Sequence, residues 1–499
     1  MSVWAGEAAD PVPADPRRWW GLVVIALAQL MVVLDSTIVN IALPSAQRDL
    51  GMTDGNRQWV ITAYTLAFGG LLLLGGRIAD LVGRKRTFVT GLVGFAAASA
   101  LGGAATTPGL LFGARALQGV FAAVLAPSAL SLLTTAFTDP RERGRAFGIY
   151  GVLAASGSAT GFIVGGLLTE YLDWRWCLFV NVPIAVIAVA GALALLRDPP
   201  RHAGARLDVP GVVLGCGGLV ALVYGFSEAE SRGWSDGLVL ALFAVGVALL
   251  TVFVWWQSRA AVPLLPLHIL RDRDRAGCFL TMMLAVLAMF GLFLFMTYYL
   301  QAVLGYSPVR TGLAFLPLTA SILIGSTQVS ARLLPRLPPR MLLAPGMVLA
   351  ASGMLILTRM TVRSSYATEI LPALILIGLG MGLTFMPVFS TATAGVAPQD
   401  SGVTSATVNT SQQVGGSIGT ALLNTIATAS GAAYVAARPS GPGLRSDIVR
   451  EGVVHGYTVA LWWAACIMLL AALVAGLMVT AKAPRHGTVA DAPVPESVA

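Results

Sequence analysis

Residues 19–43, WWGLVVIALAQLMVVLDSTIVNIAL, decide the fold class of this chain. They form one apolar run that contains a single charged residue, Asp35. An α-helix needs about 20 such residues to cross the hydrocarbon core of a bilayer. The run is too long for the core of a signal peptide, and no small-residue cleavage site follows it. We therefore expect a retained membrane-spanning helix that carries a carboxylate inside the bilayer.

The whole chain shares this apolar character. Of its 499 residues, 56% are hydrophobic and only 11% are charged, and the mean hydropathy is +0.78. In a soluble protein roughly a quarter of the residues are charged, and a disordered chain is polar and charge-rich. The composition excludes both classes for a chain of this length. It predicts an all-α integral membrane protein.

Apolar runs of spanning length recur along the chain and predict 14 transmembrane helices. The expected spans are 19–43, 58–79, 87–106, 109–133, 146–170, 175–196, 209–226, 237–256, 277–301, 311–331, 341–359, 368–389, 402–430 and 456–480.

The basic residues orient these spans. With the N-terminus in the cytoplasm, 21 of the 32 Lys and Arg residues fall in inner segments and ten in outer segments, while Arg115 lies inside a span. Membrane proteins carry such an excess on the cytoplasmic side. We therefore expect a multi-pass protein of the cell membrane with both termini in the cytoplasm. The net charge of +8 is spread between apolar runs, which suits a lipid bilayer surface and not a nucleic acid.

The two longest inner loops divide the spans into a 6+2+6 arrangement, two six-helix bundles and an inserted helix pair. Secondary transporters are commonly built from such repeats, with the substrate site between the halves. The expected parts are a cytoplasmic N-terminal tail (1–18), an N-terminal six-helix bundle (19–196), the inserted pair with its flanking loops (197–276), a C-terminal six-helix bundle (277–481) and a cytoplasmic C-terminal tail (482–499).

Residues 76–86, GRIADLVGRKR, close the second expected span at the cytoplasmic face. Gly83 permits a tight turn, and the basic residues after it anchor the turn at anionic headgroups. Asp80 needs a positive partner, which the N-terminus of the helix expected at Asp400 or Ser401 can supply. The alternative is a loop that only sets topology.

Asp35 and Arg115 are the only opposite charges well inside the expected spans, at comparable depth. A charge inside a span is costly and indicates function by default, and pairing is the cheapest way to hold both. Burial favours the neutral form of Asp35, whereas Arg115 favours its ionised form. A carboxylate balanced in this way can load and release a proton. The alternative is an ion pair that only orders the bundle.

These motifs resemble signatures of the major facilitator superfamily. The family's loop signature G-x-x-x-D-x-x-G-R-K/R and its fourth-span pattern R-x-x-Q-G are matched at Gly76, Asp80, Gly83, Arg84 and Lys85, and at Arg115, Gln118 and Gly119. Residues 34–44, LDSTIVNIALP, look like the first-span signature of fourteen-span drug:proton antiporters. The resemblance implies a cytoplasmic latch between the two halves, proton coupling at Asp35 and Arg115, and a monomeric transporter.

A glycine series in the fifth expected span predicts close helix packing. Residues 157, 161 and 165 repeat every four positions and therefore share one helix face. The spacing resembles the superfamily's antiporter motif, although Phe162 stands where that motif has Pro. Ordinary tight packing is the alternative. The series comprises Gly148, Gly157, Gly161, Gly165 and Gly166.

Six polar or aromatic residues are candidates for a substrate cavity: Asn40, Gln118, Tyr298, Asn409, Gln412 and Gln413. The last three share a face of the thirteenth expected span, and Tyr298 belongs to an aromatic group in the ninth. Interhelical hydrogen bonds and ordinary packing are the alternatives. Neither the tenth nor the thirteenth expected span contains an acidic residue, which argues against a strongly dicationic substrate.

The sequence has no phosphate-binding loop, metal-ligand cluster or nucleophile triad. We therefore expect no enzyme activity and no metal or cofactor, with the proton gradient as the energy source. The prediction is a proton-coupled efflux transporter, an antiporter that exports a lipophilic small molecule such as an antibiotic or drug. The alternatives are a proton-coupled importer or symporter of the same fold and a non-transporting membrane receptor.

Overall fold

The computed structural model describes residues 18–137, 140–196, 208–260, 263–396, 401–438 and 445–481. Over these ranges every regular element is a helix, and none is a strand. A helix satisfies its own backbone hydrogen bonds, which a lipid environment cannot do. The all-α prediction is therefore confirmed for the described residues.

The helices follow one another with short connections. The first seven are α1 (Arg18–Leu50), α2 (Trp59–Val82), α3 (Arg84–Gly103), α4 (Pro108–Ala136), α5 (Pro140–Tyr171), α6 (Trp176–Phe179) and α7 (Asn181–Leu195). Two more are α8 (Val209–Arg232) and α9 (Gly237–Gln257). The remainder are α10 (Leu267–Arg271), α11 (Arg273–Tyr298), α12 (Pro308–Ile324), α13 (Ala331–Leu333), α14 (Arg340–Leu357), α15 (Leu371–Thr393), α16 (Ser401–Ala436) and α17 (Arg445–Met478), with π-helical turns η1 (Tyr299–Val303), η2 (Gly325–Ser330) and η3 (Tyr366–Ile370).

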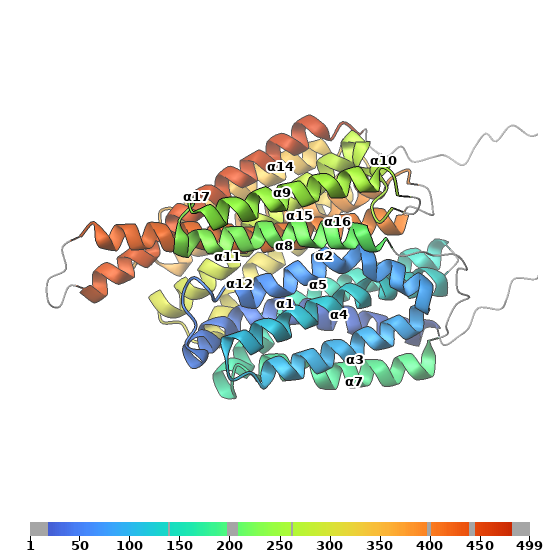
Figure 1. Cartoon of the computed structure of the whole chain (residues 1–499), viewed down its shortest axis with the longest axis horizontal. Coiled ribbons are helices and arrows are strands. Elements are labelled where there is room, and N and C mark those ends of the chain that lie inside the picture. The colour runs from blue at the N-terminus through green and yellow to red at the C-terminus, as the bar shows by residue number, and fades with distance from the viewer. Residues whose placement is uncertain are drawn as a thin grey trace, which may run out of the picture.

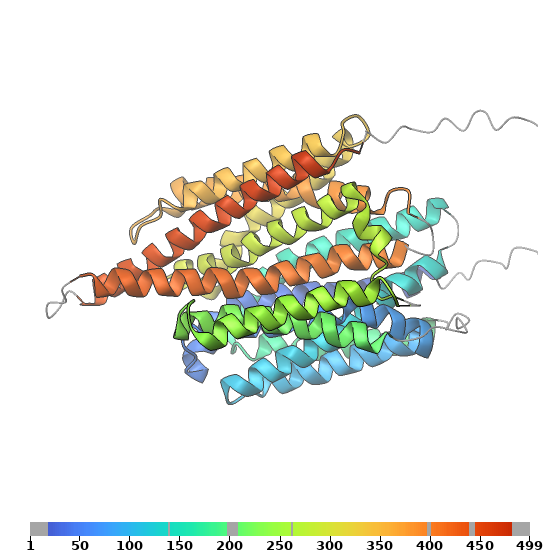
Figure 2. The same ribbon diagram turned by 45° about the horizontal axis from the view of Figure 1, so that its top comes forward.

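The long helices pack as two groups that are joined by a helix pair (Figures 1 and 2). In the first group, α1 packs against α5 and α7, and α4 packs against α2 and α3. In the second group, α11 packs against α16 and α17, and α14 packs against α15 and α17. The groups meet along α2 with α16 and along α5 with α12, while α8 pairs with α9 and contacts both α2 and α16.

Ten helical segments of the described chain are long and apolar enough to cross a membrane, among them α1, α4 and α17. Because consecutive long helices run in opposite directions, the loop 51–58 and the turn at Gly83 lie at opposite ends of the bundle. We call these the 51–58 end and the Gly83 end. At the 51–58 end, α16 and α17 project beyond the other helices (Figures 1 and 2).

The span expected over 175–196 is present as α6 and α7, which lie on either side of Val180. Val180 keeps helical dihedral angles (φ −59°, ψ −25°), and Trp176–Leu195 forms one apolar helical segment. Asn181 is fully buried in the first turn of α7, within the first group. α5 also runs without interruption through Phe162, as expected for a helix that lacks Pro there.

Candidate functional site

The predicted contact between Asp35 and Arg115 is present at the centre of the first group. Asp35 lies on α1 and Arg115 on α4, and Arg115 Nη1 donates to Asp35 Oδ2 over 2.6 Å. Their exposed fractions are 0% and 1%. An unpaired charge at such a site would be strongly destabilising, so each residue depends on the other.

Two amides complete the coordination of the carboxylate. Gln118 Nε2 and Asn181 Nδ2 both donate to Asp35 Oδ1, over 3.1 and 2.8 Å. The same two nitrogens also donate to Ser99 Oγ, over 3.0 and 2.9 Å, and Ser99 donates to the carbonyl of Leu178 over 2.7 Å. Asp35 therefore accepts three hydrogen bonds from side chains of α4 and α7.

Arg115 is held from several sides. Its Nε donates to the carbonyl of Val60 over 3.0 Å, and its Nη1 also donates to Gln118 Oε1 over 2.8 Å. The guanidinium carbon lies 4.4 Å from the centre of the Tyr64 ring, a cation–π contact. Three contacts besides the ion pair with Asp35 therefore hold the guanidinium.

Beside Arg115 lies a small apolar cavity of about 10 Å³, enough for about one water molecule. Val39, Leu43, Val60 and Trp174 contribute to its lining. Apart from Arg115 the lining is largely apolar, and Asp35 is not part of it.

Sequence reasoning missed Asn181, Ser99 and Tyr64 as members of this network. Their side chains are ordinary polar residues in apolar runs, and only the packing of α1, α2, α3, α4 and α7 brings them together with Asp35 and Arg115. The sequence signal at Asn181 is its position as an amide two residues before Pro183, at the start of an apolar stretch. No comparable signal marks Ser99.

The predicted latch residues surround the turn between α2 and α3. Gly83 has a φ of 112°, which a residue with a side chain adopts only with strain. Lys85 Nζ donates to the carbonyls of Leu193 and Leu196 at the end of α7, so it caps a helix of its own group. A methyl group at Gly76 would meet only ordinary contact distances.

The helix N-terminus predicted as the partner of Asp80 falls at the edge of the described residues. The Asp80 side chain and Asp400 lie outside the described residues, and α16 begins at Ser401. Arg77, one turn before Asp80, donates to the carbonyl of Pro263 over 3.2 Å. This contact links α2 to the segment that leads into the second group.

Three glycines of the series pack α5 closely against α1, a partner helix that the sequence does not predict. A methyl group added at Gly157, Gly161 or Gly165 would lie 3.2 Å or less from Val33, Thr37 or Ile38 of α1.

Gly166 instead meets the backbone of Val309 in α12, where an added methyl group would lie only 2.7 Å away. It therefore packs at the interface between the groups. Gly148 lies outside the residues whose packing the structure describes.

A second buried cation joins the two groups at the 51–58 end. Arg57 is 4% exposed, and its Nη1 lies 2.8 Å from Oδ1 of the half-exposed Asp54. Its guanidinium carbon lies 3.8 Å from the ring centre of Tyr298, and Nη2 donates to Tyr457 Oη over 3.4 Å. Asn424 of α16 donates to the carbonyl of Asp54 over 3.0 Å. We call these five residues the Arg57 clasp.

The six cavity candidates are dispersed. Gln118 is fully buried in the Asp35 network, and Tyr298 is 5% exposed beneath Arg57. Asn40 and Asn409 donate to carbonyls of their own helices, Ser36 and Ser405.

Gln412 and Gln413 are half-buried on α16. A methyl group at Gly69 of α2 would lie 2.5 Å from Gln413 Cβ, so Gln413 faces the first group.

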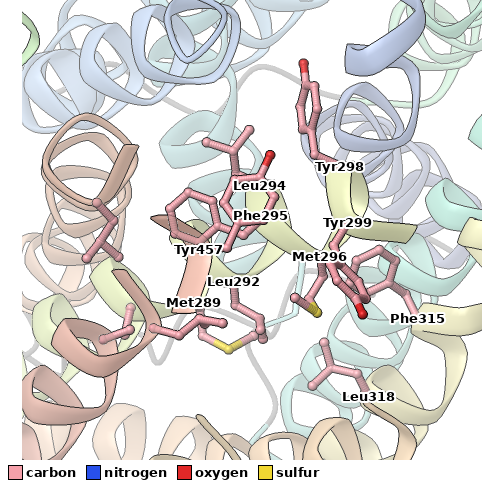
Figure 3. Close-up of a cluster of buried hydrophobic side chains, with 14 of the residues drawn as sticks. Met289, Leu292, Leu294, Phe295, Met296, Tyr298, Tyr299, Phe315, Leu318 and Tyr457 are labelled. Atoms are coloured by element: carbon pink, nitrogen blue, oxygen red, sulfur yellow. The ribbon is translucent and has the colours of Figure 1, made fainter. Parts of the chain in front are cut away.

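Most aromatic side chains of α11 pack within the protein. Phe295 stacks on Tyr457 with ring centres 5.1 Å apart (Figure 3). Phe293 lies 5.7 Å from both Phe162 and Phe315, which stack on each other across the α5–α12 contact. These rings form part of the interface between the groups, which agrees with the packing alternative.

Comparison with known families identifies one match. A model described as the Major Facilitator Superfamily matches residues 25–420.

Curated relatives carry names that refer to antibiotics. The chain is 56% identical over 478 residues to the puromycin resistance protein of Streptomyces alboniger, covering 95% of this chain and 94% of that one. It is 40% identical to a cephamycin export protein of Amycolatopsis lactamdurans, covering 81% and 84%. It is 32% identical to the tetracenomycin C resistance and export protein of Streptomyces glaucescens, covering 97% and 95%.

Solved structures share the fold at low sequence identity. A bacterial homologue of the human lysosomal transporter Spinster, inward-facing and occupied, superposes with a TM-score of 0.66 at 16% identity, covering 93% of this chain and 97% of that one. A transporter of the POT family gives a TM-score of 0.65 at 14% identity, covering 93% of this chain and 98% of that one.

Proposed function

The chain belongs to the Major Facilitator Superfamily, and we propose that it is an antiporter that exports a lipophilic, antibiotic-like molecule across the cell membrane in exchange for protons. The observation that carries the proposal is the fully buried Asp35, whose Oδ2 lies 2.6 Å from Arg115 Nη1. Intramembrane carboxylates of this kind mark proton relays. The antibiotic resistance and export proteins among the relatives support the direction and the substrate class.

The proposed membrane arrangement is 14 spans with both termini in the cytoplasm. The first group, the α8–α9 pair and the second group then correspond to the 6+2+6 division into 19–196, 197–276 and 277–481. The excess of Arg and Lys at the Gly83 end supports this orientation. The Gly83 end would face the cytoplasm, and the 51–58 end the outside. The protein would act as a monomer.

In the proposed cycle, Asp35 takes up a proton when the 51–58 end opens, and bound substrate leaves. The protonated protein then closes that end and opens the Gly83 end, where Asp35 releases its proton and a new substrate binds. The Arg57 clasp supports this scheme, because it joins the groups at one end only. The turn at Gly83, with Asp80, would act as the latch at the other.

The substrate is expected to be neutral, anionic or monocationic. Neither α12 nor α16 contains an Asp or Glu, so the second group offers no carboxylate in these helices to a second positive charge. The binding surface would lie between the groups and include Asn409, Gln412 and Gln413 with Tyr298 and Asn40. No cofactor is required in this scheme.

The test is drug uptake into everted vesicles under an imposed pH gradient, with puromycin as the first compound of a panel. Asp35→Asn should abolish gradient-driven uptake while the protein is still produced in normal amount. Asp447→Asn, at an exposed position at the start of α17, is the matched control and should transport normally.

Three outcomes would contradict the proposal. Undiminished uptake by Asp35→Asn would exclude this carboxylate as the coupling group. Drug movement in the same direction as the protons, and not in the opposite direction, would indicate a symporter. Drug binding without any flux would indicate a receptor.

A further inference from the structure

Two amide side chains donate to the same oxygen of Asp35, but they are held differently. The carbonyl oxygen of Gln118 accepts from Arg115 Nη1 over 2.8 Å. The carbonyl oxygen of Asn181 has no hydrogen-bond partner among the described residues, although Asn181 is 0% exposed. A buried carbonyl without a partner is costly and calls for an explanation.

The present orientation of Asn181 follows from the charge of Asp35. An ionised carboxylate only accepts hydrogen bonds, so the NH₂ group and not the carbonyl must face Asp35 Oδ1. The distance of 2.8 Å from Asn181 Nδ2 to that oxygen fits this assignment. Gaining a proton changes the requirement, since a neutral carboxyl group carries an O–H donor that needs an acceptor.

The other neighbours of Asp35 cannot supply that acceptor. Arg115 has only donors. Turning the Gln118 amide would place its NH₂ group against Arg115 Nη1, donor against donor. The Ser99 hydroxyl already accepts from both amides and donates to Leu178.

We propose that Asn181 is a second member of the proton site, whose side-chain amide turns when Asp35 is protonated and accepts the new hydrogen bond. The inference rests on the proposed function only in requiring that Asp35 takes up a proton. A lone pair of Asp35 Oδ1 binds a proton delivered by water, and the resulting O–H donates to Asn181 Oδ1. The charge of the network rises by one, and no other covalent bond changes. The turn gives up the hydrogen bond from Asn181 to Ser99, which keeps its contacts with Gln118 and Leu178.

The test is infrared difference spectroscopy of the purified full-length protein in lipid nanodiscs, recorded between alkaline and acidic pH. The wild-type spectrum should show a protonated carboxyl band that is absent in Asp35→Asn, together with an amide carbonyl band. In Asn181→Leu, which has a similar shape and no polar atoms, the amide band should be lost. The carboxyl band should move to higher frequency, because its O–H has lost its acceptor.

Asn181→Ser separates acceptor chemistry from a merely structural role. Its hydroxyl can accept, so the carboxyl band should stay closer to the wild-type frequency than in Asn181→Leu, although the amide band is lost. Gln118→Leu should retain the amide band. Puromycin binding at alkaline pH reports whether each variant is folded.

Two results would overturn the inference. An amide band that persists in Asn181→Leu, or a carboxyl band that does not move, would exclude Asn181 as the acceptor while leaving proton coupling intact. Absence of any band that depends on Asp35 would contradict the proposed function and the inference together.

Discussion

Arg115 is the residue on which the candidate site most depends. It neutralises Asp35, fixes Gln118 and bonds to the carbonyl of Val60. We expect Arg115→Ala to destabilise the protein by about 3–5 kcal/mol, because it leaves a buried carboxylate unpaired. Arg115→Lys should also lack transport, because an ammonium group cannot reproduce the planar fork of the guanidinium.

A double variant tests this explanation. In Asp35→Asn/Arg115→Gln both charges are removed, so the thermal unfolding temperature in detergent should recover most of the loss seen in Arg115→Ala. Transport should remain absent. If the double variant were no more stable than the single one, the cost would arise from lost packing and not from the unpaired charge.

At the scale of single residues, the sequence predicts the charged part of the site and not its polar part. Asp35 and Arg115 could be found because charges are rare within spans, and Gln118 because it belongs to a recognisable pattern. No sequence signal marks Ser99, and the one signal at Asn181 is its place two residues before Pro183. The roles of both residues depend on the approach of α3 and α7 to Asp35, which leaves no trace in hydropathy.

At the scale of elements, the contact between α1 and α5 depends on the absence of side chains. A methyl group at Gly161 would lie 1.9 Å from Thr37 Oγ1. Gly161→Ala should therefore destabilise the protein by roughly 1–3 kcal/mol through overpacking, measured as a lower unfolding temperature. Gly113→Ala in α4 is the control, because nothing lies within 4 Å of its added methyl group. Equal effects of the two changes would contradict the packing explanation.

Asp208 joins the start of α8 to the end of α9. This carboxylate accepts from the backbone of Gly211, from Trp256 Nε1 and from Gln257 Nε2, over 3.0, 2.7 and 2.6 Å. Burial by itself would raise the pKa of Asp208, but these hydrogen bonds outweigh it and hold the pKa below its ordinary value. We expect Asp208→Ala to cost about 1–2 kcal/mol at neutral pH, as for the loss of a helix cap.

The destabilisation caused by Asp208→Ala should become smaller at acidic pH. Because the folded-state pKa is lowered, the stabilisation is complete above the unfolded pKa of about 3.9 and is lost as the pH falls through the folded value. The gap in unfolding temperature between wild type and Asp208→Ala should thus be constant from pH 5 to 7 and shrink below about pH 4. A gap that widened on acidification would contradict the assignment.

At the scale of the whole molecule, the Arg57 clasp connects the two groups at the 51–58 end. Arg57→Ala removes the cation–π contact with Tyr298 and the bond to Tyr457, so the population with this end open should increase. Spin labels at the exposed Thr53 and Ser365 should then show a longer distance component in electron resonance measurements. Arg359→Ala, at an exposed site, should leave the distances unchanged.

The all-helical fold class was the part of the fold that the sequence predicted best. Long apolar runs predict where helices lie, because a bilayer permits little else. The sequence predicted the ends of the helices less well. The last expected span begins at residue 456, but α17 begins at Arg445, and polar residues beyond the bilayer give no hydropathy signal. The positions at which the groups touch, such as Gly166 with Val309, follow from tertiary packing alone.

The neutrality of the Asp35–Arg115 pair has an electrical consequence. The carboxylate and the guanidinium cancel, so the site carries no net charge until a proton arrives, and one positive charge afterwards. If each cycle exports a neutral drug and imports one proton, current flows inward through the protein. The membrane voltage then drives export directly, by about 2.3 kcal/mol per charge for every 100 mV. A monocationic drug exchanged for one proton would be electrically silent, so voltage would favour the export of neutral compounds.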